Sequence, residues 1–425
     1  MVEIRRVHGS RATLAAVTGT RAVRRLLFLL PFPPRLDAVH GGSRATAQLL
    51  GALADRHRIA AVCLRGTDEP PVDDGLRARC ELLEEVERGP AGTLLGRWRH
   101  RAGVARSRLS GTPRWVAQWA VEAYETRVRT LARTWRPDIV QIEFHIMGQY
   151  LTALQGSAAP RVLVEHEPGA PAARDRGRLQ RGLPRLLSHL EVHAWERYER
   201  AIIRQVHAVV VFTDRDGRAL APLAPGVRLA RIPLGTVLPE RPLDPLGHQP
   251  LSIVFMGSFI HPPNVDAADR LVGSIFTRLR RHFPKLLLHV VGDNPPSRIR
   301  AMAGENVIIT GRVPDTGPYL DHAALMVAPL RLGGGMRVKV LEGLAAGKAL
   351  VASPLAVEGL DLADGVQVVL AETDQEFCDA IGGLLSDPER RATIARRARA
   401  WACANLGWEK SVAAYERLYD SLIAG

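Results

Sequence analysis

The chain has 425 residues, of which 46% are hydrophobic but only 5% aromatic, and its formal net charge is +13. This length exceeds one ordinary domain and allows two sizeable cores, and the aliphatic bias is typical of α/β proteins. The four cysteines (Cys63, Cys80, Cys378 and Cys403) are scattered and form no CxxC pair, which argues against a disulfide framework and a thiolate zinc site. No stretch approaches about 18 uninterrupted apolar residues, so we expect no membrane-spanning segment and a cytoplasmic location.

The positive charge is carried almost entirely by arginine, since only four of the 57 basic residues are lysine. Such a charge suits an anionic substrate, an anionic membrane surface or nucleic acid, and it does not choose among them. The stretch Leu94–Arg108 is basic and carries a tryptophan, and Trp115–Trp135 is expected to continue it as a helix. This region could make a peripheral contact with an anionic membrane. We favour the other reading, a solvated face whose tryptophans pack into the domain.

The N-terminal half begins with an expected flexible leader, residues 1–24. The apolar run Leu26–Leu30 then predicts a strand, a loop with Gly41 and Gly42 follows, and Ala45–Arg56 predicts a helix. Ligands of doubly wound sheets bind outside the carboxyl ends of the strands. The paired glycines are therefore candidate ligand contacts.

Two further buried strands, Asp138–Ile142 and Arg161–Val164, each deliver a histidine at the carboxyl end. His166 is the stronger functional candidate and His145 the weaker one, because a histidine in a loop is often only hydrogen-bonded there. His189 and His193 stand four residues apart on an expected helix. The glutamate between them lies on the opposite face, so this pattern favours a surface helix over a metal site.

The segment Gly235–Leu251 has four prolines and no apolar periodicity, so we place the domain linker at residues 235–251. Beyond it, strands alternate with loops and helices, which predicts a second parallel sheet with right-handed crossovers. The N-terminal domain then covers residues 25–234 and the C-terminal domain residues 252–404.

The most informative stretch is Val327–Leu360, which reads as strand, glycine loop, helix and strand. Three glycines, Gly333–Gly335, stand just before the helix predicted at Met336–Ala346, where backbone N–H groups can approach an anion. Arg337 and Lys339 would sit in the first turn, where cations are unfavourable by about 0.3–1 kcal/mol each unless an anion binds beside them. A diphosphate is the natural candidate for that anion.

Glu342 follows on the same face of that helix, about 10 Å beyond the glycine loop at 1.5 Å of rise per residue. This distance suits a carboxylate that accepts hydrogen bonds from a sugar hydroxyl while the phosphates lie at the helix start. The alternative is a surface Lys339–Glu342 ion pair beside a flexible loop, worth about 0.2–0.5 kcal/mol.

Several segments carry a family resemblance: FMGSFIHPPNVDA, HVVGDNPP, ITGRVPDTGPYLDHA and APLRLGGGMRVKVLEGLAAGKALVASPLAVEGL, with weaker N-terminal support from LLFLLPFPP, RPDIVQIE and VLVEHE. They resemble the retaining, nucleotide-sugar-dependent glycosyltransferases of family 4 (glycosyl transferases group 1), and the resemblance covers nearly the whole ordered chain. It implies the α/β GT-B fold, in which two Rossmann-like domains with doubly wound parallel sheets face each other across a cleft. The final helix, in residues 405–425, is expected to cross back to the N-terminal domain.

The resemblance also implies roles for individual residues. His166 would lie near the transferred sugar, Arg337 and Lys339 near the diphosphate, and Glu342 would match the second glutamate of the family's E-x7-E motif, which holds the ribose. The expected donor-binding residues are Gly41, Gly42, Gly257, Ser258, Gly292, Arg312, Val313, Gly333, Gly334, Gly335, Met336 and Glu342.

One departure concerns the first glutamate of that motif, because its position is held by Gly334. In relatives this glutamate contacts the transferred sugar, so its absence puts the choice of donor in doubt.

Neither a DxD pair at a strand end nor a convincing His/Asp cluster is present, so we expect no metal site, and no cofactor besides the nucleotide-sugar donor. Fixed cations and a helix N-terminus would stabilise the leaving diphosphate instead.

Three alternatives remain. A catalytically idle scaffold that binds a nucleotide sugar or a partner is supported only by Gly334. A nucleic-acid-binding protein is disfavoured because the arginines are spread over the chain without a known module. An epimerase or phosphorylase on the same fold lacks a cofactor-lysine signature. The donor base, the sugar, the acceptor (small molecule, glycan or lipid-linked) and the oligomeric state stay open.

Overall fold

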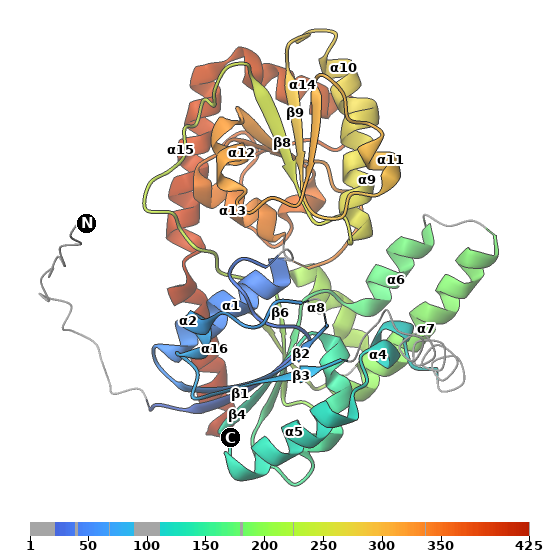
Figure 1. The fold of residues 1–425 in the computed structure, drawn as a ribbon, viewed down its shortest axis with the longest axis vertical. Helices are drawn as coiled ribbons and strands as arrows, with labels where there is room; N and C mark the ends of the chain where they lie inside the picture. The colour runs from blue at the N-terminus through green and yellow to red at the C-terminus, as the bar shows by residue number, and fades with distance from the viewer. Residues whose placement is uncertain are drawn as a thin grey trace, which may run out of the picture.

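The computed structural model describes residues 22–38, 41–67, 69–88, 111–178, 182–223, 225–335 and 337–424. Most of the expected leader, the basic stretch Leu94–Arg108 and the candidate residue Met336 lie outside these ranges. The described chain forms two lobes, each built on a parallel sheet with helices packed around it (Figure 1). The predicted fold class is therefore confirmed.

The first lobe holds a seven-stranded sheet in the order β3-β2-β1-β4-β5-β6-β7, and all its strand pairs are parallel. Helices cover such a sheet on both faces, which is why its central strands are continuous apolar runs. The elements of this lobe are β1 (Arg25–Leu30), α1 (Gly41–Ala54), β2 (Arg58–Arg65), α2 (Asp74–Arg77), β3 (Leu82–Glu87), α4 (Arg114–Gln118), α5 (Glu122–Thr134), β4 (Ile139–Glu143), η1 (His145–Leu154), β5 (Arg161–Glu165), α6 (Gly169–Arg178), α7 (Leu183–Ile203), β6 (Ala208–Val211), α8 (Asp214–Leu220), η2 (Ala221–Leu223) and β7 (Arg228–Arg231).

The second lobe holds a six-stranded parallel sheet in the order β10-β9-β8-β11-β12-β13. The elements are β8 (Ser252–Met256), α9 (Pro262–Arg270), η3 (Leu271–Phe276), α10 (Thr277–Leu279), β9 (Leu287–Val291), α11 (Ser297–Arg300), β10 (Val307–Gly311), α12 (Gly317–His322), β11 (Leu325–Ala328), α13 (Val338–Ala346), β12 (Leu350–Ala352), η4 (Pro354–Val357), β13 (Val369–Leu370), α14 (Asp374–Ser386), α15 (Pro388–Asn405) and α16 (Trp408–Ile423). Between β7 and β8 the chain, which includes the expected linker, forms no helix or strand.

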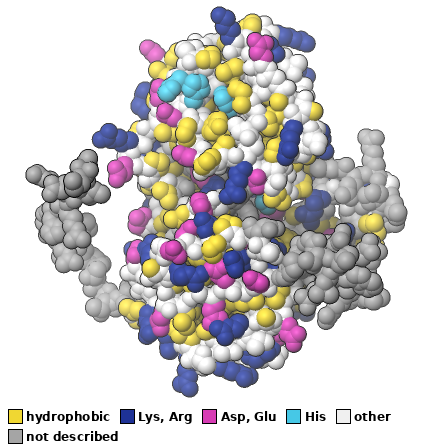
Figure 2. Space-filling view, viewed as in Figure 1, with side chains coloured by type: hydrophobic (Ala, Val, Ile, Leu, Met, Phe, Trp, Pro, Cys, Tyr) yellow, Lys and Arg dark blue, Asp and Glu magenta, His cyan; other side chains and the backbone are white. Residues whose placement is uncertain are grey.

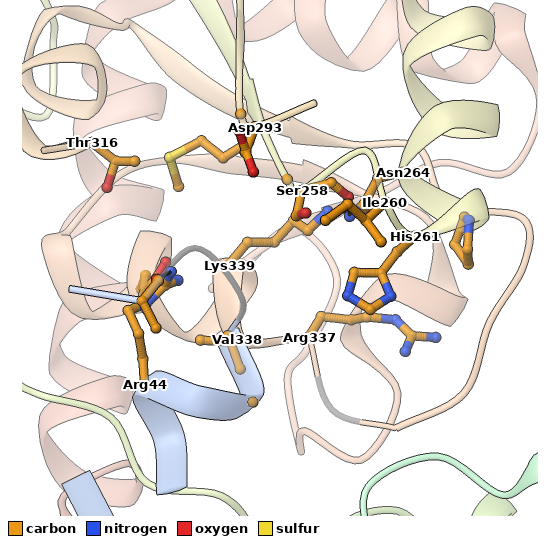
Figure 3. Close-up of a pocket in the computed structure, with 18 of the residues that line it drawn as sticks. Arg44, Ser258, Ile260, His261, Asn264, Asp293, Thr316, Arg337, Val338 and Lys339 are labelled. Atoms are coloured by element: carbon orange, nitrogen blue, oxygen red, sulfur yellow. Dashed lines mark hydrogen bonds and ion pairs between the residues drawn. The ribbon is translucent and has the colours of Figure 1, made fainter. Parts of the chain in front are cut away.

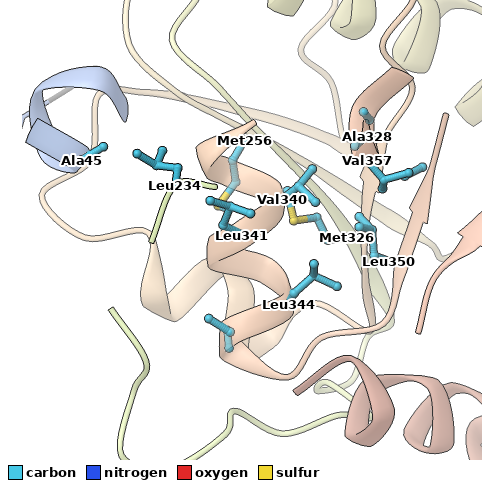
Figure 4. Packing of buried hydrophobic residues seen from close by; sticks show 14 of the residues in the cluster. Ala45, Leu234, Met256, Met326, Ala328, Val340, Leu341, Leu344, Leu350 and Val357 are labelled. Carbon is cyan, nitrogen blue, oxygen red and sulfur yellow. The ribbon is translucent and has the colours of Figure 1, made fainter. Parts of the chain in front are cut away.

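Helix α13 carries the glycine loop and is anchored by an apolar stripe. Val340, Leu341 and Leu344 are fully buried, and Figure 4 shows them among side chains that include Met256, Met326 and Leu350. The helix ends at Gly347, whose left-handed φ of 76° lets the chain turn toward β12.

Helix α16 leaves the second lobe and packs on the first, beside α1 (Figure 1). The indole Nε1 of Trp408 donates to Gln48 of α1 at 2.9 Å, and Arg56 pairs with the buried Glu416 at 3.2 Å. Helix α16 is thus fixed to the lobe that contains β1. Among the residues that the structure describes, no helix is long and apolar enough to cross a membrane.

Three expectations about helices were wrong. Helix α1 begins at Gly41, so Gly41 and Gly42, expected in a loop before a helix at Ala45–Arg56, form its first turn. Trp115–Trp135 is not one helix but two, α4 and α5, because the Tyr150 hydroxyl donates to Trp119 O at 2.6 Å and accepts from Val121 N at 2.9 Å, which satisfies backbone groups at the break. Helix α13 begins at Val338, so Arg337 precedes its first turn and has a non-helical φ of −90° and ψ of 87°.

Candidate active site

A cavity of about 1280 Å³ lies between the two lobes and is lined by residues from both. Figure 2 shows this boundary across the middle of the molecule, with Lys and Arg side chains exposed near it. Most of the predicted site residues line the cavity: His166, Gly41, Gly42, Gly257, Ser258, Gly292, Arg312, Val313, Gly333, Gly334, Arg337, Lys339 and Glu342. Gly335 lies just behind the lining, and Met336 is outside the described residues.

The cationic part of the cavity is formed by Arg337 and Lys339. The guanidinium of Arg337 folds back onto the glycine loop and donates to the carbonyl oxygens of Gly335 and Gly333, both at 2.8 Å. Burial lowers its pKa from the ordinary value, and the charge of Glu167 partly offsets this effect. Arginine stays protonated under such a shift, so the loop carries a fixed positive charge.

Lys339 points toward the loop after β8, where its ammonium group donates to Asn264 and lies 4.7 Å from the ring centre of Phe255 (Figure 3). Burial, and then the charge of Arg337, lower the pKa of Lys339 to about 7. An anion that enters the cavity would favour the protonated, positively charged form of this lysine.

Two polar atoms near these cations point to a ligand. Within the described ranges, the hydroxyl oxygen of Ser258 and the Nε of Arg337 are buried without a hydrogen-bond partner. Buried polar groups are rarely left unpaired, so each such atom calls for an explanation. A phosphate group between the loop after β8 and the start of α13 would accept from both.

The amide groups of the glycine loop face the first lobe rather than open space. Gly334 N donates to Glu167 Oε1 at 2.7 Å, Gly335 N to Asp216 Oδ2 at 3.2 Å and Gly333 N to Asp175 Oδ2 at 3.4 Å. The sequence-based expectation that these amides aim at a ligand is therefore wrong for this structure. The carboxylates that cap the loop join the two lobes.

Glycine is required at position 335 for two reasons. Its φ of 68° is left-handed, and a Cβ there would lie 2.0 Å from the carbonyl oxygen of His166. Gly41 serves a similar close approach, since its Cβ would meet Val338 at 2.9 Å. Helix α1 thereby approaches the first residue of α13.

Glu342 is already engaged in an ion pair across the lobes. Its carboxylate accepts from Arg44 Nη2 of α1 at 2.7 Å, and each side chain is about a quarter exposed. The alternative Lys339–Glu342 surface pair is not formed, because each residue has another partner. A ribose at Glu342 would have to share the carboxylate with Arg44.

His166 lies on the first-lobe side of the cavity in a well-defined orientation. Its Nε2 is 2.7 Å from Glu143 Oε2, and its ring stacks on Phe144 with 3.6 Å between ring centres and 6° between planes. Phe212 meets it edge-on at 5.1 Å. Phe144 itself has a left-handed φ of 67°, an uncommon backbone conformation that occurs at functional sites.

His145 also lines the cavity, is 2% exposed, and joins a cluster with Glu165 and Glu199 whose potential ligand atoms lie within 4.8 Å of one another. The sequence predicted no metal site, but this group has the composition to hold an ion. Burial lowers the pKa of His145 to about 4, while burial and then Glu165 raise the pKa of Glu199 to about 7. Protons can therefore keep the cluster close to neutral without an ion.

His189 and His193 are exposed on α7, and His193 Nδ1 interacts with the carbonyl oxygen of His189 at 2.9 Å. They make no contact with the cavity, in agreement with the surface-helix prediction.

Sequence reasoning did not identify several residues that shape the cavity: Arg44, Glu143, Glu167, Asp175, Asp216, His261 and Asn264. The only sequence signal for them was position, because Glu143, Glu167 and Asn264 stand in loops or at strand ends on the ligand side of the sheets. His261 is one of the residues drawn in the close-up of the cavity (Figure 3).

Comparisons with known proteins agree with this architecture. The sucrose-phosphate synthase of Thermosynechococcus elongatus superposes with a TM-score of 0.71 at 16% identity, over 94% of this chain and all of the other. The Anabaena protein HepE, solved in complex with UDP-glucose, gives 0.63 at 14% identity, over 95% of this chain and all of the other. The fold is GT-B.

In sequence, residues 250–387 match the family model described as glycosyl transferases group 1. An uncharacterized glycosyltransferase of Methanocaldococcus jannaschii is 27% identical over 150 residues, which is 33% of this chain and 38% of that relative. The GT-B fold and these two matches support a glycosyltransferase.

Proposed function

We propose that this GT-B protein is a retaining glycosyltransferase that moves a sugar from a nucleotide-diphosphate sugar to an acceptor hydroxyl without a metal ion. The observation that carries the proposal is a set of groups in the cavity lining, Arg337, Lys339 and Ser258, in which the Ser258 hydroxyl is buried without a hydrogen-bond partner among the described residues. Preorganised cations stabilise charge that develops on a leaving diphosphate. A metal ion would otherwise serve that purpose.

The donor would lie along α13, with its diphosphate at Arg337 and Lys339 and its ribose toward Glu342. The nucleotide-sugar assignment draws support from HepE, a protein of the same fold whose structure contains UDP-glucose. The sugar would keep its configuration without a protein nucleophile if the acceptor oxygen attacked the anomeric carbon on the face from which the diphosphate leaves. The leaving phosphate oxygen would take the proton of the acceptor hydroxyl. His166 would lie beside the transferred sugar.

The acceptor would enter from the first lobe, where the cavity wall includes Trp115, Phe144 and Arg176. A cytoplasmic location and a peripheral membrane contact belong to the same proposal. Trp115 on α4 and Leu190 on α7 are 40% and 64% exposed and could make such a contact.

One structural observation favours the alternative, a scaffold that binds a nucleotide sugar without turnover. The glycine-loop amides and Glu342 are occupied by side chains of the first lobe. A scaffold would bind nucleotide with normal affinity and release no free nucleoside diphosphate from the sugar donor in the presence of any acceptor.

The deciding experiment is a calorimetric titration with UDP, GDP, ADP and dTDP, with and without EDTA. We expect EDTA-insensitive binding of one nucleotide, weakened by roughly tenfold or more in Arg337→Ala and in Lys339→Ala because each removes a charge-assisted contact of about 1.5–3 kcal/mol. Arg331→Ala is the matched control, since it removes a nearby cation that pairs with Asp266 outside the cavity lining. Unchanged affinity in both cavity variants would refute the donor site.

A further inference from the structure

The ends of β4 and β5 are joined by two reciprocal histidine–glutamate pairs. Glu143 at the end of β4 faces His166 after β5, with 2.7 Å between Oε2 and Nε2. In the opposite sense, Nδ1 of His145 after β4 meets Oε1 of Glu165 at the end of β5. Both histidines line the cavity, but His145 is only 2% exposed and its partner Glu165 is fully buried, so the first pair is the more open of the two.

The first pair continues into the core as a chain of side-chain hydrogen bonds. The other carboxylate oxygen of Glu143, Oε1, accepts from Gln141 Nε2 at 2.5 Å, and Gln141 Oε1 accepts from the hydroxyl of Tyr419. Gln141 and Tyr419 are 0% exposed and Glu143 is 1% exposed. Tyr419 belongs to α16, the helix that crosses over from the second lobe.

Gln141 is a polar residue in a buried central strand whose neighbouring residues are apolar. A polar side chain in such a place costs free energy unless it is hydrogen-bonded. Its two polar ends are satisfied by Glu143 and by Tyr419. Burial, and then the charge of Glu143, raise the pKa of Tyr419 well above its usual value, so the hydroxyl keeps the proton that it donates.

The direction of each hydrogen bond in this chain is fixed by chemistry. Tyr419 donates, which orients the amide of Gln141 with its NH2 group toward Glu143. A carboxylate oxygen accepts from a ring N–H, so this contact places a proton on Nε2 of His166. Nδ1 is then the ring nitrogen left for another partner, and stacking on Phe144 holds the ring plane.

We propose that Glu143 is a positioning residue that sets the tautomer and orientation of His166, and that Gln141 and Tyr419 hold Glu143 in place. The packing of α16 on the first lobe thereby helps to orient a side chain of the cavity. The proposal rests on the proposed function only in that His166 acts on the bound sugar. The tautomer itself is a property of the protein without substrate.

Glu143→Gln is the sharpest test because it keeps the shape and changes the polarity. With the Gln141 NH2 group oriented by Tyr419, the new amide would offer its oxygen to Gln141 and its NH2 group to His166. Nε2 of His166 would then have to accept, and the proton would move to Nδ1. Long-range ¹H–¹⁵N spectra of the full-length protein, with His166→Ala to assign the signal, report this directly.

We expect Glu143→Gln to shift His166 from the Nε2–H to the Nδ1–H form, to lower kcat by roughly tenfold or more, and to leave the affinity for UDP within about twofold, because the nucleotide lies on the other lobe. A His166 signal that stays in the Nε2–H form would overturn the proposal. If the tautomer shifts but the wild-type protein transfers no sugar, the positioning chain stands and the proposed function fails.

A second pair of variants tests the distal end without touching the cavity. Tyr419→Phe removes only the hydroxyl that orients Gln141. Tyr415→Phe makes the same change at another buried tyrosine of α16, which is not part of the hydrogen-bond series from Tyr419 to His166. We expect a lower kcat in Tyr419→Phe alone, and a mixed His166 tautomer when Tyr419→Phe, but not Tyr415→Phe, is combined with Glu143→Gln, because nothing then orients the new amide. Equal effects of both tyrosine variants on kcat, or a single His166 tautomer in the Glu143→Gln and Tyr419→Phe double variant, would refute the role of α16.

Discussion

The ion pair between Arg44 and Glu342 should compete with the donor, and Arg44→Ala should therefore bind nucleotide more tightly. The two groups are 2.7 Å apart, join α1 to α13 and are each about a quarter exposed. Exposed ion pairs contribute about 0–1 kcal/mol and charge-assisted hydrogen bonds in drier sites about 1.5–3 kcal/mol. For this half-buried pair we take about 1 kcal/mol, which corresponds to roughly fivefold in affinity.

The assay is calorimetric titration of the wild-type protein and the variant with the nucleotide that the wild-type protein prefers. Arg56→Ala is the matched control, because Arg56, in the turn after α1, pairs with Glu416 of α16 and does not line the cavity. Glu342→Ala should weaken binding, since it removes the proposed ribose acceptor along with the competitor's partner. Weaker binding in Arg44→Ala would refute the reasoning and would mean that Arg44 contacts the phosphates directly.

The remaining predictions concern the lysine and the glycine loop. The pKa of Lys339 is lowered to about 7, and a bound diphosphate favours the protonated form, so nucleotide affinity should fall by up to roughly tenfold per pH unit above pH 7 and should lose this dependence in Lys339→Met. Titrations between pH 6 and about 9 check this, and an equal slope in both proteins would contradict it. Gly335→Ala should destabilise the protein by about 1–3 kcal/mol or more, because it adds a clash with His166 O to the cost of a positive φ. Gly365→Ala, at a φ of 70° with nothing within 4 Å, measures the backbone cost alone, and denaturant unfolding of the two variants should differ clearly.

The sequence predicted the two sheets well because their signals are local. Buried parallel strands appear as continuous apolar runs, and the stripe of α13 repeats at helical spacing, so both can be read within ten residues. The break between α4 and α5 could not be read in this way. It depends on Tyr150, which reaches back about thirty residues to satisfy the backbone at Trp119 and Val121.

The sequence predicted which segments line the cavity but not which residues they are hydrogen-bonded to. The glycine loop, Arg337 and Lys339 do line the cavity, because loops after parallel strands gather at one edge of a sheet. Their hydrogen bonds join residues far apart in the chain: Gly334 and Glu167 are separated by 167 positions, and Gly335 and Asp216 by 119. Neither a motif nor a periodicity in one sequence records such pairs.

These partners change what the glycine loop means. Free amides at a helix start would make a ready phosphate site, but here Glu167 and Asp216 accept from them, and Arg44 holds the carboxylate of Glu342. The side chains of Arg337, Lys339 and Ser258 are among the groups that line the cavity and can meet an anion there. Under the proposed function, donor binding would involve two opposing terms: the diphosphate would gain contacts with these cations, and the ribose would displace a contact that holds the lobes together. A donor that opened the Arg44–Glu342 pair would remove one contact between α1 and α13. Donor binding on the second lobe would then change how the first lobe, which carries His166, packs against it.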